Sequence, residues 1–271
     1  MSGSVAHLVC DAGAMIGESP LCSRGQVLWT DPLAPGLLLY SRDTLRRIPT
    51  ARPIWSLAGL PDTDVCGTLD DAFCAVETTG ALRPGARAQI DTGCRFNDMA
   101  LDPGGGLWAG VMHRGVIATR GSIFHARSLE EEPRAVASGL GAPNGMQFSS
   151  DGSKLYVIDT LMRTLLAYPV SGPKLGEPVI ISDFLGIPGK PDGMTLGSDG
   201  TFWVAMWGGS CVAQLASDGA LLRQISVPAP HVSSLCFMTP DRLFVTTSRM
   251  RLSPAALADS PGSGALFEIH P

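Results

Sequence analysis

Hydrophobic positions alternate with polar ones in short runs along the whole chain, and one such pattern recurs. An oxygen-bearing side chain is followed by apolar residues two and four places on, then by a turn and a strand containing Trp or Tyr. The pattern is clearest over 191–204, with a copy over 143–157, 48 residues earlier, and another over 96–108, 47 residues before that. Alternation indicates strands and Asp-Gly or Gly-Gly indicates hairpin turns, so each copy predicts a β-hairpin.

Three weaker copies extend the repeat toward both ends of the chain. They begin at Glu18, near Asp64 and at Ser234, and they continue into strands over 27–29, 73–76 and 243–247. Strands over 37–40 and 52–57 are expected to complete the first unit, and 254–258 is expected to form one short helical turn. Six units in 271 residues give about 45 residues each, which is the length of a four-stranded propeller blade.

The periodicity therefore predicts an all-β fold, a six-bladed β-propeller with four antiparallel strands per blade. We expect residues 1–271 to form a single domain, because no linker is visible. The N-terminal strand over 5–10 and a closing strand over 264–270 are expected to share the last blade. Sharing a blade closes the ring and removes an open sheet edge.

Composition narrows the function classes. The formal net charge is −5 and the basic residues are scattered, so we expect neither nucleic acid nor a membrane surface as a partner. Seven cysteines occur without a Cys-x-x-Cys pair, which argues against a thiolate zinc site and suggests that most of them are small buried hydrophobic residues in a reducing compartment. The N-terminus lacks the features of a signal peptide, and no apolar run is long enough to cross a membrane. We expect a cytoplasmic protein, a monomer or a small homo-oligomer.

One repeat position carries the candidate chemistry. The first strand of each propeller blade lines the central channel, so this position brings together Glu18, a residue near Asp64, Asn97, Asn144, Asp192 and Ser234. Two carboxylates and two amides in a tunnel are unfavourable unless something satisfies them, and Ca²⁺, Mg²⁺ or Mn²⁺ bound by hard oxygen ligands would do so. Turn formation is the alternative role for Asn144 and Asp192. Each of those repeats has its own later turn, however, and Glu18 is not a turn former.

At these positions the sequence resembles the senescence marker protein-30/gluconolactonase/regucalcin family along essentially its whole length. The resemblance is carried by residues 17–20, 95–98, 107–112, 143–145, 191–193, 203–209, 227–232 and 245–249. It implies hydrolysis of a sugar lactone with one divalent metal ion, which could be Ca²⁺, Zn²⁺, Mg²⁺, Mn²⁺ or Fe²⁺. By that resemblance Glu18, Asn144 and Asp192 bind the metal, and Arg95 and Asn97 bind the lactone.

Two departures from the family pattern affect substrate specificity. The first blade is shorter than is usual in the family, and His113-Arg114 stands where some relatives carry acidic residues. A histidine at position 113 resembles the pattern of the pentonolactonase-like members, and His113 is expected to contact the substrate. The alternative for His113, and likewise for His231, is a position at the rim without substrate contact. Trp207 is expected either at the mouth or in the core.

The mechanism that we hypothesise combines Lewis-acid polarisation of the lactone carbonyl by the metal with base catalysis by Asp192. Asp192 takes a proton from the attacking water and later returns it to the ring oxygen. Arg95 lies near the developing charge or, alternatively, pairs with Asp98. The main competing hypothesis is a non-catalytic, regucalcin-like propeller that binds calcium or another ligand. A propeller esterase and a scaffold for protein partners are further alternatives, but Arg95 and Asn97 favour turnover because an ion binder has no use for them.

Overall fold

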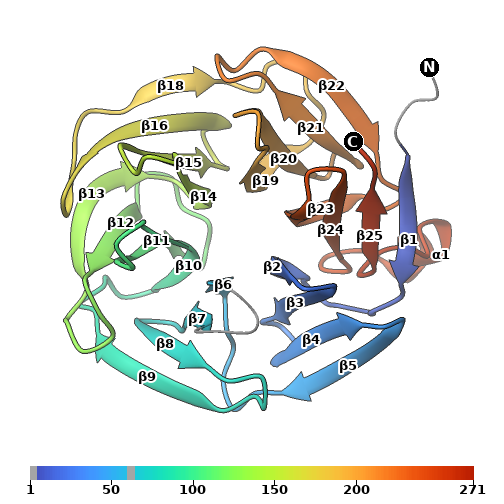
Figure 1. Ribbon diagram of the computed structural model, residues 1–271, viewed down its shortest axis with the longest axis horizontal. Coiled ribbons are helices and arrows are strands. Elements are labelled where there is room, and N and C mark those ends of the chain that lie inside the picture. The colour runs from blue at the N-terminus through green and yellow to red at the C-terminus, as the bar shows by residue number, and fades with distance from the viewer. Residues whose placement is uncertain (1–4, 60–64) are drawn as a thin grey trace.

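Antiparallel β-sheets arranged in a ring make up residues 5–59 and 65–271, which are the residues that this computed structural model describes (Figure 1). Within them the single helix is α1 (Pro254–Asp259), which Ser253 caps by accepting a hydrogen bond from the Ala256 amide at 3.2 Å. The expected short helical turn and the all-β class are both confirmed.

The sheets follow one another along the chain. The first contains β2 (Glu18–Ser23), β3 (Gln26–Asp31), β4 (Gly36–Ser41) and β5 (Thr44–Pro49), and the second contains β6 (Ser56–Ala58), β7 (Val65–Thr68), β8 (Ala72–Val76) and β9 (Leu82–Arg87). The third contains β10 (Cys94–Leu101), β11 (Leu107–His113), β12 (Gly121–Ala126) and β13 (Arg134–Leu140). The fourth contains β14 (Pro143–Phe148), β15 (Lys154–Asp159), β16 (Thr164–Ser171), the short β17 (Lys174–Leu175) and β18 (Val179–Ser182).

The remaining strands form one larger sheet from two groups. One group is β19 (Lys190–Leu196), β20 (Phe202–Trp207), β21 (Cys211–Leu215) and β22 (Leu221–Ser226), and the other is β23 (His231–Thr239), β24 (Arg242–Ser248), β25 (Leu266–Ile269) and β1 (Ala6–Cys10). A single residue pair, Trp207 with His231, joins the two groups. The N-terminal strand β1 pairs antiparallel with β25 (Figure 1).

The core lies between neighbouring sheets. Ile158 and Leu165 of the fourth sheet pack with Phe202 and Val204 of the next group, and all four are almost fully buried. Burying such side chains stabilises the fold by about 1.5 to 3 kcal/mol each. The innermost strands β2, β6, β10, β14, β19 and β23 each contact the next, and β23 contacts β2. This contact order brings six strand beginnings to one central axis.

The second unit starts earlier than the sequence pattern predicts. Its innermost strand is Ser56–Ala58, whereas Val65–Thr68 is the second strand and pairs with β8. The predicted strand over 52–57 therefore does not complete the first unit, which ends with β5; its last two residues begin β6 of the second sheet. Asp64 lies outside the described residues. The error arose because the inner strand is only three residues long and offers too little alternation to be recognised.

Two findings concern the cysteines and the membrane. Cys22 and Cys236, which are 214 residues apart, form a disulfide that ties β2 to β23, a pairing that the sequence analysis does not predict. The other five cysteines form no disulfide within the described chain, and Cys74, Cys94 and Cys211 among them are buried. Within the described chain, no helix has the length and apolar character needed to cross a membrane.

We expect the thermal stability of the protein to depend on the redox state of the Cys22–Cys236 disulfide. It joins the first inner strand to an inner strand near the other end of the chain, so its reduction frees a very long loop in the unfolded state. We expect reduction to cost about 2 to 4 kcal/mol and to lower the Tm by about 5 to 10 °C, measured by calorimetry with and without a reductant. The Cys22→Ser variant should melt at the lower temperature and be insensitive to the reductant. Equal Tm values for the oxidised and reduced wild-type protein would contradict the prediction.

Candidate functional site

Five of the inner strands break their β-register at the same place. The interruptions follow Glu18 in β2, Phe96 in β10, Asn144 in β14, Pro191 in β19 and Val232 in β23. An interruption of the β-bulge type bends a strand and re-aims its side chains, and such bulges are frequent beside active sites. The repeat position found in the sequence is therefore a structural feature that turns polar side chains toward the axis.

A cavity of about 700 Å³ opens at this end of the inner strands. Of the predicted site residues, it is lined by Glu18, Arg95, Asn97, Asn144 and Asp192. Ser234 instead lines a second cavity, of about 350 Å³, formed by later residues of the same strands. In β23 the residue at the bulge is Ser233, whose hydroxyl donates to the Gly17 carbonyl at 2.5 Å, so the sequence register was one residue off there.

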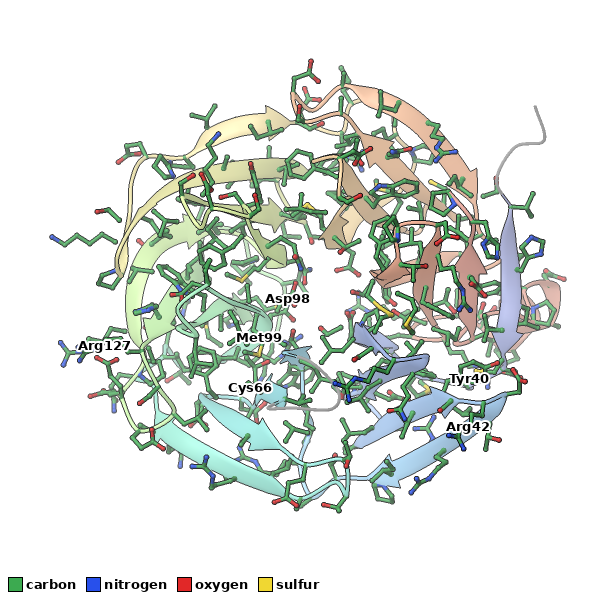
Figure 2. All side chains as sticks on the ribbon, viewed as in Figure 1. Tyr40, Arg42, Cys66, Asp98, Met99 and Arg127 are labelled. Atoms are coloured by element: carbon green, nitrogen blue, oxygen red, sulfur yellow. A yellow bond between two sulfur atoms is a disulfide. The ribbon has the colours of Figure 1, made fainter. Side chains whose placement is uncertain are left out.

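Acidic side chains are concentrated at the axis. Burial first, and then the charges of Asp192 and Asp98, raise the pKa of Glu18 well above its ordinary value. Burial and the charge of Asp98 likewise raise the pKa of Asp192, which is only 7% exposed. Asp98 lies near the centre of the ring (Figure 2). Like charges held together in a low-dielectric site are unfavourable unless protons or a cation compensate them.

Asp98 is compensated by the protein itself. Burial raises its pKa, but its carboxylate accepts hydrogen bonds from the Ser56 hydroxyl at 2.7 Å and from the amides of Met99 and Met146 at 2.9 and 3.1 Å. These contacts tie the third sheet to the second and the fourth. Asp98 therefore acts as a structural acid below the cavity, and the sequence analysis considered it only as a partner for Arg95.

A chain of side-chain hydrogen bonds crosses the cavity wall. Arg95 donates to Asn97 Oδ1 at 2.7 Å, and Asn97 Nδ2 donates to Asn144 Oδ1 at 2.7 Å. Asn144 Nδ2 in turn donates to the Thr160 hydroxyl at 2.9 Å. Each amide is thereby held in one orientation, which links the predicted substrate residues to a predicted metal ligand. Thr160 follows β15 directly, a position that the repeat alone did not mark.

Arg95 is held by an aromatic ring and not by Asp98. Its guanidinium carbon lies 3.6 Å from the centroid of the Trp55 ring, a cation–π contact. The Trp55 indole donates to Asp70 at 2.8 Å, and Asp70 pairs with Arg114 at 2.6 Å. Burial, followed by the charge of Arg114, lowers the pKa of Arg95 to about 10, so the side chain remains a cation at neutral pH. Trp55 was missed because the second unit was placed too late in the sequence.

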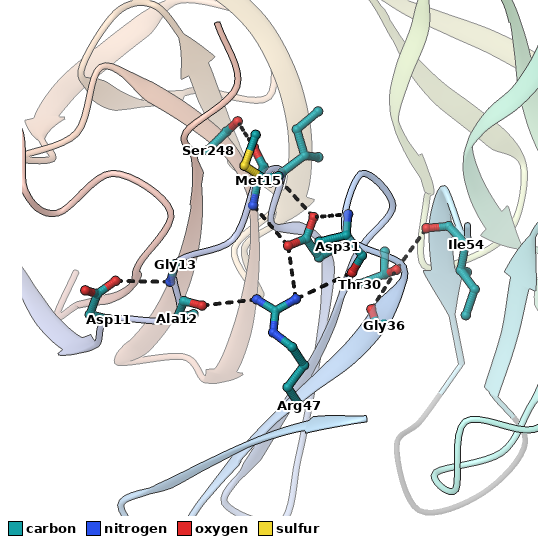
Figure 3. A network of polar contacts seen from close by, with 12 residues as sticks. Asp11, Ala12, Gly13, Met15, Thr30, Asp31, Gly36, Arg47, Ile54 and Ser248 are labelled. Carbon is teal, nitrogen blue, oxygen red and sulfur yellow. Dashed lines mark hydrogen bonds and ion pairs between the residues drawn. The ribbon is translucent and has the colours of Figure 1, made fainter. Parts of the chain in front are cut away.

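Two buried carboxylates fix the segments that lead into the site, and Figure 3 shows the contacts of the first, Asp31. Asp31, which is fully buried at the end of β3, accepts hydrogen bonds from the amides of Met15 and Ile16 at 3.0 and 3.2 Å. These residues immediately precede Glu18. Asp159, at the corresponding end of β15, accepts from the amides of Gly141 and Ala142 at 2.7 and 3.1 Å, just before Asn144. The same device thus positions two predicted ligands.

His113 is not among the residues that line the cavity. Its Nδ1 accepts a hydrogen bond from the Gly115 amide at 3.0 Å, and its ring lies close to Gly93. The next residue, Arg114, lines the cavity instead. His113 ends strand β11, where the chain turns, so its side chain supports the turn that presents Arg114.

Trp207 and His231 form a stacked pair at the cavity. Trp207 lines the cavity wall, and its ring centroid lies 4.3 Å from that of His231 with an angle of 8° between the planes. Burial and the charge of Arg251 lower the pKa of His231. The pair therefore presents one flat aromatic face, with His231 behind it.

The donor set fits a hard divalent cation. Two acidic groups whose pKa values are raised share the cavity with the amide of Asn144, and oxygen ligands of this kind suit Ca²⁺, Mg²⁺ or Mn²⁺. No histidine or cysteine lines the cavity among the residues of 5–59 and 65–271. In the same ranges no cluster of three His, Cys, Asp or Glu side chains is arranged as a metal site, so an amide must complete any such set.

A family model described as the SMP-30/Gluconolactonase/LRE-like region matches residues 16–249. The chain belongs to this family. Pentonolactonase XacC of Haloferax volcanii is 30% identical over 251 residues, which are 89% of this chain and 84% of that protein. The 6-deoxy-6-sulfogluconolactonase of Pseudomonas putida is 30% identical over 272 residues, 94% of this chain and 90% of that protein. Among solved structures, regucalcin, a calcium-binding protein of Agrobacterium tumefaciens strain C58, has a TM-score of 0.88 at 27% identity, covering 98% of this chain and 93% of that one.

The crowded acids predict an unusual pH dependence for the metal-free protein. A carboxyl whose pKa is raised by folding favours stability below its ordinary pKa, and this contribution is lost as the pH rises through the raised value. We therefore expect Glu18→Gln to raise the Tm in chelator at about pH 8 and to have little effect at about pH 4. Each unit by which folding raises the pKa corresponds to about 1.4 kcal/mol of unfolding free energy, or to a Tm difference of about 3 to 5 °C.

Thermal melts across this pH range measure the difference between variant and wild type. Glu177→Gln, an exposed substitution far from the cavity lining, is the matched control and should show no such divergence. A difference for Glu18→Gln that does not change with pH would show that the carboxyl is unperturbed.

Proposed function

We propose that the protein hydrolyses a sugar lactone to the sugar acid, using one divalent cation held by Glu18, Asn144 and Asp192. The relatives are named as sugar lactonases, which supports lactone hydrolysis in general. The observation that carries the proposal is the union of these three oxygen donors with Arg95 and Asn97 in one cavity. A protein that only binds calcium has no need of the Arg95 guanidinium, which is linked through Asn97 to the proposed metal-binding residue Asn144.

The fold proposed with this function is a six-bladed β-propeller. Each of the four separate sheets corresponds to one blade, and the larger sheet corresponds to two blades joined through Trp207 and His231. In this scheme β1 completes the last blade beside β25. The contact order of the inner strands, in which β23 meets β2, supports it.

The chemistry divides among the residues of the cavity. A bound divalent cation would supply Lewis acidity for the lactone carbonyl and would offset the two carboxylates. Asp192 accepts a proton from the attacking water on its carboxylate and returns it to the ring oxygen as the ester bond breaks. Burial beside Asp98 keeps the pKa of Asp192 higher than for an exposed carboxyl, which favours this acceptor role near neutral pH.

Arg95 and Asn97 orient the substrate. The Arg95 guanidinium lies over the Trp55 ring and is fixed by hydrogen bonds to the Phe96 carbonyl and to Asn97, so little conformational entropy is lost when it meets a ligand. Its remaining N–H groups provide donors near the negative charge that develops on the carbonyl oxygen. Because His113 lies outside the lining, we assign substrate contact in this region to Arg114.

Metal removal tests the proposal directly. We expect chelation to lower kcat/KM for aldonolactones by at least about 100-fold, and single divalent ions added back should restore it. Hydrolysis is followed by proton release across a panel of five- and six-membered lactones. An unchanged rate after stripping would contradict the metal's role, whereas tight metal binding without any turnover would favour the non-catalytic, calcium- or ligand-binding alternative.

The base is tested by Asp192→Asn, which we expect to lower kcat by about 100-fold or more. Asp218→Asn is the control, because Asp218 is an exposed turn residue that lies outside the cavity lining and whose side chain accepts a hydrogen bond from the Ala220 amide. Metal affinity of both variants, measured by calorimetry, separates loss of the base from loss of a ligand. Full activity of Asp192→Asn would remove Asp192 from the mechanism.

A further inference from the structure

The rim of the cavity is strongly basic, although the chain as a whole is acidic. The formal net charge is −5, yet within residues 5–59 and 65–271 the acidic side chains that line the cavity are Glu18 and Asp192, against a larger set of cations. The cations that line the cavity are Arg95, Arg114, Arg163, Lys190 and Arg251. A cleft lined by one sign of charge concentrates ligands of the opposite sign, so the source of each positive charge matters.

Three of these cations are already engaged by the protein. Arg95 is committed to Trp55 and Asn97, as described above. Arg114 pairs with Asp70 at 2.6 Å. Arg163 donates to main-chain carbonyls of the 184–189 loop, including that of Ile187 at 2.9 Å. These side chains have structural partners that account for their presence.

Lys190 and Arg251 differ from the other three. Both are exposed and both line the cavity, and within the described chain neither forms an ion pair with a carboxylate. Exposed cations are usually just solvated side chains. These two stand instead at the mouth of a cavity whose floor holds the proposed reaction centre.

The sheet register places Lys190 beside Trp207, and Arg251 follows the strand that pairs with His231. Lys190 pairs with Trp207 between β19 and β20, and Trp207 pairs with His231 between β20 and β23. Arg251 lies just beyond β24 and is close enough to help lower the pKa of His231. Its turn is anchored, because the Met250 amide donates to the Met15 carbonyl at 3.0 Å. The two cations thus flank one aromatic platform on a rigid frame.

We propose that Lys190 and Arg251 bind an anionic substituent of the substrate, so that the preferred substrates are lactones carrying a phosphate, sulfonate or carboxylate group remote from the ester. The sugar ring lies over Trp207, whose face is supported by His231. Charged groups recognise oxyanions through short, charge-assisted hydrogen bonds, and an aromatic face suits the apolar side of a sugar ring. This proposal rests on the proposed lactonase function and specifies its substrate class.

The test compares gluconolactone with gluconolactone bearing a phosphate, a sulfonate or a carboxylate on its terminal carbon. For the wild-type protein we expect a higher kcat/KM for the anionic lactones, and a preference that falls as ionic strength rises. In the Lys190→Gln, Arg251→Gln double variant, kcat/KM for the anionic lactones should fall by about 10- to 100-fold. The rate for neutral gluconolactone should remain unchanged.

Two controls keep the outcomes distinct. Lys154→Gln combined with Arg134→Gln removes the same two charges from exposed strand positions outside the cavity lining, and it should leave both substrate classes unaffected. Binding of phosphogluconate to the metal-loaded proteins, measured by calorimetry, should weaken only in the double variant of the rim.

Equal hydrolysis of neutral and anionic lactones by the wild type, or an unchanged preference in the variant, would overturn the substrate class and leave the lactonase function standing. No turnover of any lactone would overturn both.

Discussion

Repulsion among three acidic side chains at the axis is the constraint around which the rest of the structure is organised. Asp98 raises the cost of ionising Asp192, and both of them raise that of Glu18; the protein compensates only part of this cost. Asp98 receives main-chain and hydroxyl hydrogen bonds from both neighbouring sheets. Glu18 and Asp192 face the cavity, where a cation can approach them. The negative charge that the protein leaves uncompensated therefore lies on the cavity floor.

Holding such an arrangement requires a frame that cannot relax. If the backbone could relax, the acidic side chains would move apart. The segments before Glu18 and Asn144 are held by hydrogen bonds to the buried carboxylates of Asp31 and Asp159. The disulfide between β2 and β23 and the pairing of β1 with β25 restrain the region where the ends of the chain meet. Stability is concentrated in the interfaces between sheets, and the energetically unfavourable groups occupy the axis. This division is common where a scaffold maintains a strained functional site.

The sequence predicts the floor of the site well because a repeat turns spacing along the chain into proximity in space. Glu18, Asn97, Asn144 and Asp192 share one repeat position, and the structure brings all four to one cavity. Whether they bind a metal and a lactone stays a prediction. The sequence pattern reveals the second unit but misplaces its inner strand, because that strand of three residues carries no acid or amide, and Trp55 enters the cavity in its place.

Other features depend on contacts that no local pattern encodes. Cys22 and Cys236 become neighbours only because the inner strands return to their starting point. The choice between His113 and Arg114 depends on where β11 ends, since one residue of difference moves a side chain from the cavity rim into a turn. Sequence alternation locates a strand but not its last residue, because end positions are decided by turn hydrogen bonds such as that from Gly115 to His113.

The opposite charges of floor and rim are best understood as parts of one electrostatic design. An acidic floor alone would repel an anionic substrate, and a basic rim alone would hold it far from the reacting carbonyl. A divalent cation on Glu18 and Asp192 would offset their two negative charges, after which the floor no longer repels the anionic ligand that the rim attracts. Arg95 stands between the two regions, linked to the floor through Asn97 and Asn144. Electrostatic attraction of an anionic substrate to the full depth of the cavity thus depends on prior occupancy of the cation site.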